Sequence, residues 1–145
     1  MPLITRLFIK SGMIFFLISL LIGIASQIKG FSFPAIAPLF WHTLMLGWIT
    51  QIIMGVSMWM FPGRVKEENF QNQKWGWIAF ACLNVGLGLR IIAEPFLNIS
   101  EAKLWEILLV FSAIFQFIAV MAYVTEIWPR VMSKSQRRKK KKEGA

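Results

Sequence analysis

The sequence predicts an all-α membrane protein, a bundle of four transmembrane helices with both termini on the cytoplasmic side. Two features of the composition predict this class: 57% of the 145 residues are hydrophobic, and only 16% are charged. A soluble domain usually carries about a quarter charged residues, so this chain has too few charges to cover a surface that faces water. The third feature is clustering, because seven of the sixteen basic residues lie in the stretch 134–142. The net charge of +9 therefore indicates a basic tail, and we expect no nucleic-acid partner.

Four stretches have the roughly 20 apolar residues that a helix needs to cross a hydrocarbon core about 30 Å thick. They are residues 7–28, 37–61, 75–93 and 104–128. Helix-breaking residues separate them: Lys29-Gly30 with Pro34 and Pro38, then Pro62-Gly63, then the stretch 95–100, and finally Pro129 after the last one. We therefore expect one four-helix domain over residues 1–131, followed by a flexible basic tail over residues 132–145.

The basic residues also predict the orientation. Thirteen of them flank the termini and the middle loop, whereas only Lys29 and Lys103 lie on the opposite side. Lys and Arg concentrate on the cytoplasmic side of membrane proteins, so both termini are expected there. The tail is expected to meet anionic lipid headgroups, where each basic residue contributes about 1 kcal/mol.

Three ionisable residues fall inside the predicted spans, and such residues are costly enough in lipid to be functional hypotheses. His42 is near the outer end of the second span, and Arg90 and Glu94 are near the outer end of the third. All three are thus expected at a similar depth. Arg90 and Glu94 are spaced i, i+4 and can form an ion pair; alternatively, the Arg90 guanidinium can hold an anionic group such as a heme propionate. The carboxylates of Glu101, Glu106 and Glu126 are near span ends, where we expect water to hydrate them.

His42, the only histidine of the chain, is either a hydrogen-bonded interface residue or a heme ligand. Met45 is a candidate thioether ligand on the same span, and Gly47 is small enough to admit a flat macrocycle or a neighbouring helix. Polar residues near mid-span are expected to hydrogen-bond between helices: Gln51, Asn84 and Gln116.

A family resemblance rests mainly on the second span. The stretch WHTLMLGWITQ at residues 41–51, which continues to Gly55 and to WMFP at 59–62, resembles a histidine-bearing helix of the heme-copper oxidase catalytic subunit. It is most similar to the branch of C-type oxidases, nitric oxide reductases and their small relatives. Shorter pieces also look like such four-helix relatives: NVGLGLR at 84–90 with Glu94-Pro95, and WPR at 128–130.

The resemblance implies a membrane-bound b-type heme protein of the bacterial inner membrane, with His42 on the iron and Arg90 near the propionates. The family's catalytic subunit has three groups of four helices, so this chain would correspond to one third of it and could form a homotrimer, with a dimer as the alternative. One histidine per chain is too few for the family's binuclear centre. We therefore expect no copper from this chain alone, and electron transfer with a redox partner, or binding of nitric oxide or oxygen, in place of oxygen reduction.

A second hypothesis belongs to a different class. The chain could be an accessory or structural subunit of a larger membrane complex, without heme. In that case the glycine-bearing faces would serve helix packing, and His42 and Arg90 would serve as hydrogen-bonding residues.

Overall fold

The computed structural model describes residues 1–30, 33–61, 74–97, 99, 103–131, 138, 139 and 142–144. Within these residues the chain is helical and contains no strand. The elements are α1 (Leu3–Gln27), α2 (Ile36–His42), the π-helix η1 (Thr43–Thr50), α3 (Gln51–Met60), α4 (Lys74–Leu97), α5 (Lys103–Ile127) and the 3₁₀ turn η2 (Trp128–Arg130). Part of the predicted middle loop and most of the basic tail, including Arg64, Lys66 and Lys134, lie outside the described residues.

Each of the four predicted spans is a long apolar helix. The helices that are long and apolar enough to cross a membrane are Leu3–Gln27, Ile36–Met60, Lys74–Leu97 and Lys103–Arg130. The second is continuous from α2 through η1 to α3. The predicted limits differ from these by a few residues, mainly because α1 begins at Leu3 and α4 continues through Pro95 to Leu97.

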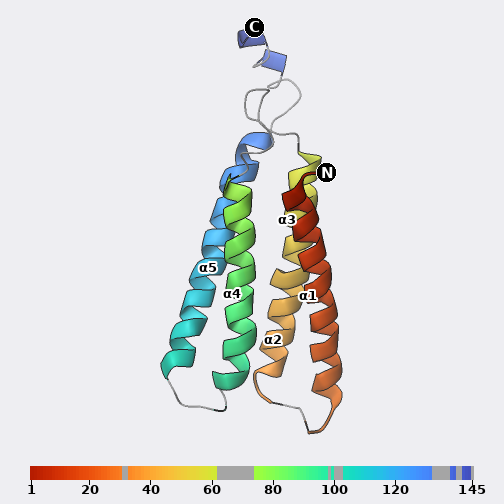
Figure 1. Cartoon of the computed structure of the whole chain (residues 1–145), viewed down its shortest axis with the longest axis vertical. Helices are drawn as coiled ribbons and strands as arrows, with labels where there is room; N and C mark the ends of the chain where they lie inside the picture. Colours follow the sequence, from red (N-terminus) through yellow and green to blue (C-terminus); the bar gives the residue numbers. More distant parts are fainter. Residues whose placement is uncertain are drawn as a thin grey trace.

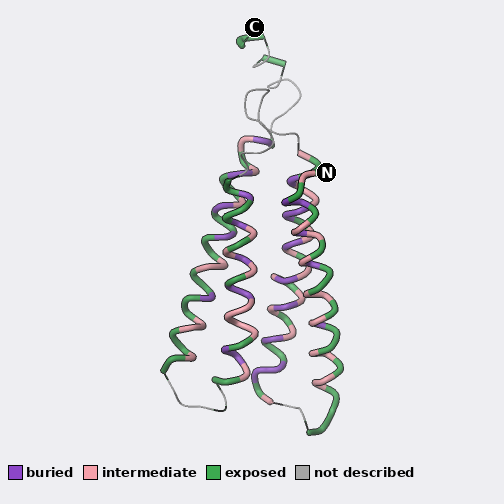
Figure 2. Tube along the Cα trace, in the orientation of Figure 1, coloured by how far each residue is buried: buried purple, intermediate pink, exposed green. Residues whose placement is uncertain are grey.

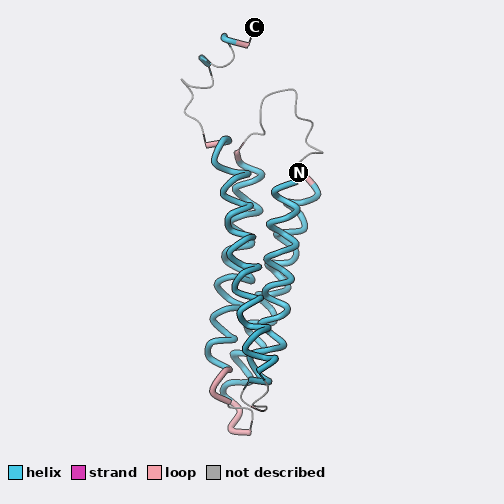
Figure 3. The backbone as a smooth tube through the Cα atoms, turned by 90° about the vertical axis from the view of Figure 1, so that its left-hand side faces the viewer, coloured by secondary structure: helices cyan, strands magenta, loops and turns pink. Residues whose placement is uncertain are grey.

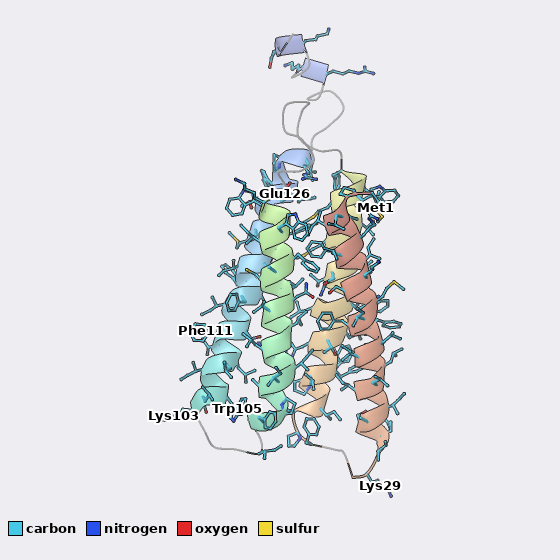
Figure 4. All side chains as sticks on the ribbon, viewed as in Figure 1. Met1, Lys29, Lys103, Trp105, Phe111 and Glu126 are labelled. Atoms are coloured by element: carbon cyan, nitrogen blue, oxygen red, sulfur yellow. The ribbon has the colours of Figure 1, made fainter. Side chains whose placement is uncertain are left out.

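The helices form two antiparallel hairpins that lie side by side (Figure 1). In one hairpin α1 packs along α2, η1 and α3; in the other α4 packs along α5. Met1 and Glu126 lie at one end of the bundle, and Lys29 and Lys103 lie at the other (Figure 4). The start of α1 and the end of α5 therefore share an end, as an even number of spans requires. Seen from the side, helix fills nearly the whole length between these two ends (Figure 3).

The interior of the bundle is small, and the outside is apolar. The core consists of Ile4, Phe8, Met54, Met58, Ala79, Leu83, Leu87, Ala119 and Ala122, drawn from all four long helices. Large apolar side chains cover the outer faces, where Leu21 is 65% and Phe117 is 67% exposed. Buried positions follow the sides of the helices that face their neighbours (Figure 2).

Glycine lets the helices approach closely at two positions in the first hairpin. A Cβ built on Gly47 would lie 2.7 Å from Cβ of Phe15, and one on Gly55 would lie 2.9 Å from Cβ of Phe8. Both distances are shorter than real carbon contacts, so only glycine permits α1 to run this close to η1 and α3.

The second span differs from the single regular helix that its sequence predicts. Residues Thr43–Thr50 form a π-helix, in which backbone hydrogen bonds span five residues in place of four. The Thr50 hydroxyl follows the same spacing, since it donates to the carbonyl oxygen of Met45 at 2.8 Å. On the α1 side, Trp48 stacks on Phe16 with ring centroids 4.1 Å apart. The π segment lies directly after His42 and directly before Gln51.

Candidate functional site: a histidine between an arginine and a glutamate

The three ionisable residues predicted at one depth meet in the structure. His42 is the last residue of α2, and Arg90 and Glu94 are on α4. Nε2 of His42 lies 3.1 Å from Nη1 of Arg90, and Nδ1 of His42 lies 2.8 Å from Oε1 of Glu94. The imidazole ring therefore has a cation at one nitrogen and a carboxylate at the other, which joins the two hairpins at this end of the bundle.

Arg90 connects three helices. Its Nη1 also donates to Oε1 of Glu94 at 3.2 Å, and its Nε donates to the Ser112 hydroxyl of α5 at 3.3 Å. Ser112 in turn donates to the carbonyl oxygen of Gly86 at 2.6 Å. The predicted i, i+4 ion pair with Glu94 is thus confirmed, and it is one part of a wider polar cluster.

Glu94 is the most buried member of the cluster. Its side chain is 8% exposed, against 16% for Arg90 and 32% for His42. Its Oε1 contacts both of the other residues, and its Oε2 has no hydrogen-bond partner among the described residues. A buried carboxylate is costly unless it is paired, so the contacts with Arg90 and His42 are what keep Glu94 in this position.

The contact between Nδ1 and Glu94 is close, but the ring N–H does not point straight at the carboxylate oxygen. Nδ1 is fully buried and has no well-aligned acceptor among the described residues. The 2.8 Å separation from Oε1 is nevertheless within hydrogen-bonding reach. We therefore treat Glu94 as the partner of Nδ1.

The π-helix explains why His42 and Gln51 both face α4. The two residues are nine positions apart, which in an α-helix corresponds to about 900° and places them on opposite faces. A π-helix advances by only about 80° per residue, so nine residues come to about two full turns and return to the same face. Gln51 accordingly donates to Oδ1 of Asn84 on α4 at 3.2 Å. No feature of the sequence predicts η1, although the site depends on it.

A second polar cluster lies in the middle of the bundle. Oδ1 of Asn84 accepts both from Gln51 and from the Ser11 hydroxyl of α1, the latter at 2.6 Å. Gln116 lies outside this cluster: it donates to the Ser112 hydroxyl at 3.2 Å, the same hydroxyl that accepts from Arg90. The interhelical contact predicted for Gln51 and Asn84 is confirmed, whereas Gln116 bonds within its own helix α5.

Two of the four predicted site residues do not join the histidine cluster. Met45 is 49% exposed on the outside of η1. Gly47 is buried against Phe15 of α1, which is a packing role in the single chain. Only His42 and Arg90 come together, and Glu94 joins them. The sequence pairs Glu94 with Arg90 alone; the shared depth of the three residues was the signal for the wider cluster.

The expectation that water hydrates Glu126 is wrong. Glu126 of α5 and Arg130 of η2 are each 4% exposed and form an ion pair with each other. Glu126 lies at the end of the bundle that carries Met1 (Figure 4). The pair is buried because α5 continues into the 3₁₀ turn and keeps Arg130 one turn beyond Glu126 on the same side. Glu106, in contrast, is exposed as expected, and Glu101 lies outside the described residues.

Within the described residues, no group of three or more His, Cys, Asp or Glu side chains is close enough to hold a metal ion alone. His42 is thus the one imidazole that this part of the chain offers as a ligand. No protein-family model matches the chain, and neither the curated proteins nor the solved structures include a significant match to it.

Proposed function

We propose that this chain is an integral membrane protein of the bacterial inner membrane, with four spans and cytoplasmic termini. The apolar outer faces support this proposal, because a contiguous apolar surface of this extent needs an apolar surrounding. In the sequence, thirteen basic residues flank the termini and the middle loop, against two in the other two loops, and this asymmetry supports the orientation.

We further propose that the protein binds heme b through Nε2 of His42. The observation that carries the proposal is the state of this nitrogen. An arginine N–H always donates, so the Nε2 atom 3.1 Å from Nη1 of Arg90 must carry a lone pair. A lone pair on a neutral imidazole is what heme iron binds. The sequence resemblance to small relatives of the heme-copper oxidases points to the same group.

The residues around His42 fit such a group. The His42 side chain is partly exposed, at 32%. Large apolar side chains are exposed along the same span, as a macrocycle requires: Trp41, Met45, Ile49 and Ile53. Arg90 would be the cation for the propionates, and its Nε could keep the hydrogen bond to Ser112. Bound heme would supply reversible one-electron chemistry or an iron site for a small gas.

One histidine per chain makes an oligomer part of this proposal. Iron with two histidine ligands needs two copies of the chain, because each copy supplies one histidine. The oxidase resemblance favours a trimer, in which three four-helix units would replace the three groups of a catalytic subunit. Two histidines on the iron would favour electron transfer with a redox partner, and a single histidine would favour binding of nitric oxide or oxygen.

The test is the visible spectrum of the protein purified after heme-supplemented expression. We expect a Soret band in the wild type and its loss in His42→Ala. Glu106→Gln, an exposed substitution on α5, is the matched control and should keep the band. A colourless wild type, or a His42→Ala variant that keeps its band, would contradict the proposal.

One observation favours the accessory-subunit hypothesis as the second candidate. His42, Arg90 and Glu94 already contact one another within a single chain, so the cluster joins α2 to α4 without any ligand. On this hypothesis wild type and His42→Ala are both colourless, and His42→Ala loosens the contact between α2 and α4. A thermal-unfolding measurement on the colourless protein would detect that loss.

A further inference from the structure

Glu94 has a contact that its place in the sequence does not suggest. It is buried on α4, and its Oε1 lies 2.8 Å from Nδ1 of His42. We propose that Glu94 is a positioning residue that, together with Arg90, holds His42 in the neutral tautomer with the proton on Nδ1 and the lone pair on Nε2. What this means for iron rests on the proposed heme function, whereas the tautomer itself does not.

The contact at Nδ1 gives the first half of the argument. This nitrogen is fully buried, and the Glu94 carboxylate oxygen is the polar atom that lies against it. An ionised carboxylate can only accept hydrogen bonds. If Nδ1 lacked a proton, its lone pair would face that oxygen across 2.8 Å. With Glu94 ionised, this contact therefore requires the proton on Nδ1.

The contact at Nε2 gives the second half independently. Arg90 can only donate, and its Nη1 lies 3.1 Å from Nε2. A proton on Nε2 would place one N–H against another, so both the opposite tautomer and the doubly protonated ring lose this contact. The two neighbours thus select one state of the ring from opposite sides.

The consequence concerns the ligand properties of His42. Histidines that bind metals usually donate their second N–H to a carboxylate or a carbonyl, which fixes the tautomer and makes the ring a stronger ligand. Glu94 is in the position of that carboxylate. Glu94 lies on α4, outside the helix that carries His42. The contact between the two hairpins therefore sets the tautomer of the imidazole before any heme binds.

The single histidine makes the tautomer directly measurable. In the full-length protein labelled with ¹⁵N-histidine and reconstituted without heme in lipid bilayers, nitrogen NMR reports one imidazole ring. For the wild type we expect a protonated Nδ1 and an unprotonated Nε2. Glu94→Ala should populate the form with the proton on Nε2, and Glu94→Gln should keep the wild-type form because its amide oxygen still accepts. Glu106→Gln, away from the ring, should match the wild type.

Two results would overturn the proposal: a wild-type ring protonated on Nε2, or a folded Glu94→Ala variant whose tautomer equals that of the wild type. The first needs no variant, so the test survives if Glu94→Ala does not fold. Wild-type protein with the expected tautomer that binds no heme would refute the heme proposal and leave the role of Glu94 intact.

If heme binds, its properties give a second readout. Removal of a residue that orients a metal ligand usually weakens metal binding about 10- to 100-fold. We therefore expect heme to dissociate faster from Glu94→Ala than from the wild type, by a factor in about this range. Glu94→Gln should retain heme but raise its midpoint potential, because a neutral amide stabilises the oxidised iron less than a carboxylate does. A midpoint potential equal to that of the wild type in Glu94→Gln would contradict the role of the Glu94 charge.

Discussion

Gly47 offers a sharp test of how the second span packs, because the structure specifies what a single added methyl group would meet. The new Cβ of Gly47→Ala would lie 2.7, 2.8 and 3.0 Å from Cβ, Cγ and Cδ1 of Phe15. The Cβ of Phe15 is fixed to the α1 backbone, so rotation of the phenyl ring cannot relieve the closest contact. Helix α1 has to move away from η1 by about 1 Å to restore an ordinary van der Waals distance.

Gly88→Ala is the matched control, since a Cβ at Gly88 meets nothing within 4 Å. Both substitutions gain about 1 kcal/mol from the higher helix propensity of alanine. Only Gly47→Ala also carries the cost of overpacking, about 1–3 kcal/mol. Because the propensity gain is common to both variants, Gly47→Ala should be less stable than Gly88→Ala by about 1–3 kcal/mol.

The assay is reversible unfolding of the heme-free protein in mixed detergent micelles, followed by circular dichroism and by tryptophan fluorescence. The stacked pair Phe16 and Trp48 lies beside Gly47 and should report the displacement of α1. If Gly47→Ala is as stable as Gly88→Ala, the close packing of α1 on η1 is refuted. If Gly47→Ala keeps its stability but loses heme, Gly47 belongs to the cofactor site, as the sequence alone suggests.

Four further outcomes follow from the same contacts. Arg90→Leu should accelerate heme dissociation about tenfold or more, as measured by transfer to an acceptor protein, and an unchanged rate would leave Arg90 to its internal hydrogen bonds. Ser57 and Tyr123 share a hydrogen bond of 2.7 Å between α3 and α5; a double-mutant cycle of Ser57→Ala and Tyr123→Phe should give a coupling of about 0.6 kcal/mol, and a coupling near zero would show that the bond contributes nothing. Glu126→Ala leaves a buried arginine without its carboxylate and should cost about 3–5 kcal/mol in unfolding free energy, whereas Glu106→Ala at an exposed position should change it by less than about 0.5 kcal/mol. Reporter fusions at either terminus should be active only as cytoplasmic reporters, and activity of a periplasmic reporter at the C-terminus would reverse the proposed orientation.

The four helices were readable from the sequence because apolar runs of sufficient length are separated by proline and glycine. The meeting of His42, Arg90 and Glu94 was partly readable, since antiparallel helices place the start of one span at the depth of the end of the next. Depth alone does not give the rotation of a helix about its axis. The contact of Glu94 with both partners of the cluster therefore required the structure.

Other features depend on neighbours that the local sequence does not name. Gly47 is equally suited to a macrocycle and to a helix, and only the position of Phe15 on α1 shows which of them contacts it in the single chain. Judged by distance along the sequence alone, Glu126 and Arg130 end a span in water. Their burial depends on the 3₁₀ turn that extends α5.

The π-helix η1 makes the length of the second span as important as its composition. An ordinary substitution within Thr43–Thr50 alters one side chain, whereas removal of a single residue would rotate α2 relative to α3 by about 80°, the advance per residue of a π-helix. His42 would then turn away from α4 while Gln51 kept its place on Asn84. The segment thus makes the histidine site intolerant of one-residue deletions, a sensitivity expected of loops at binding sites but seldom of the interior of a helix.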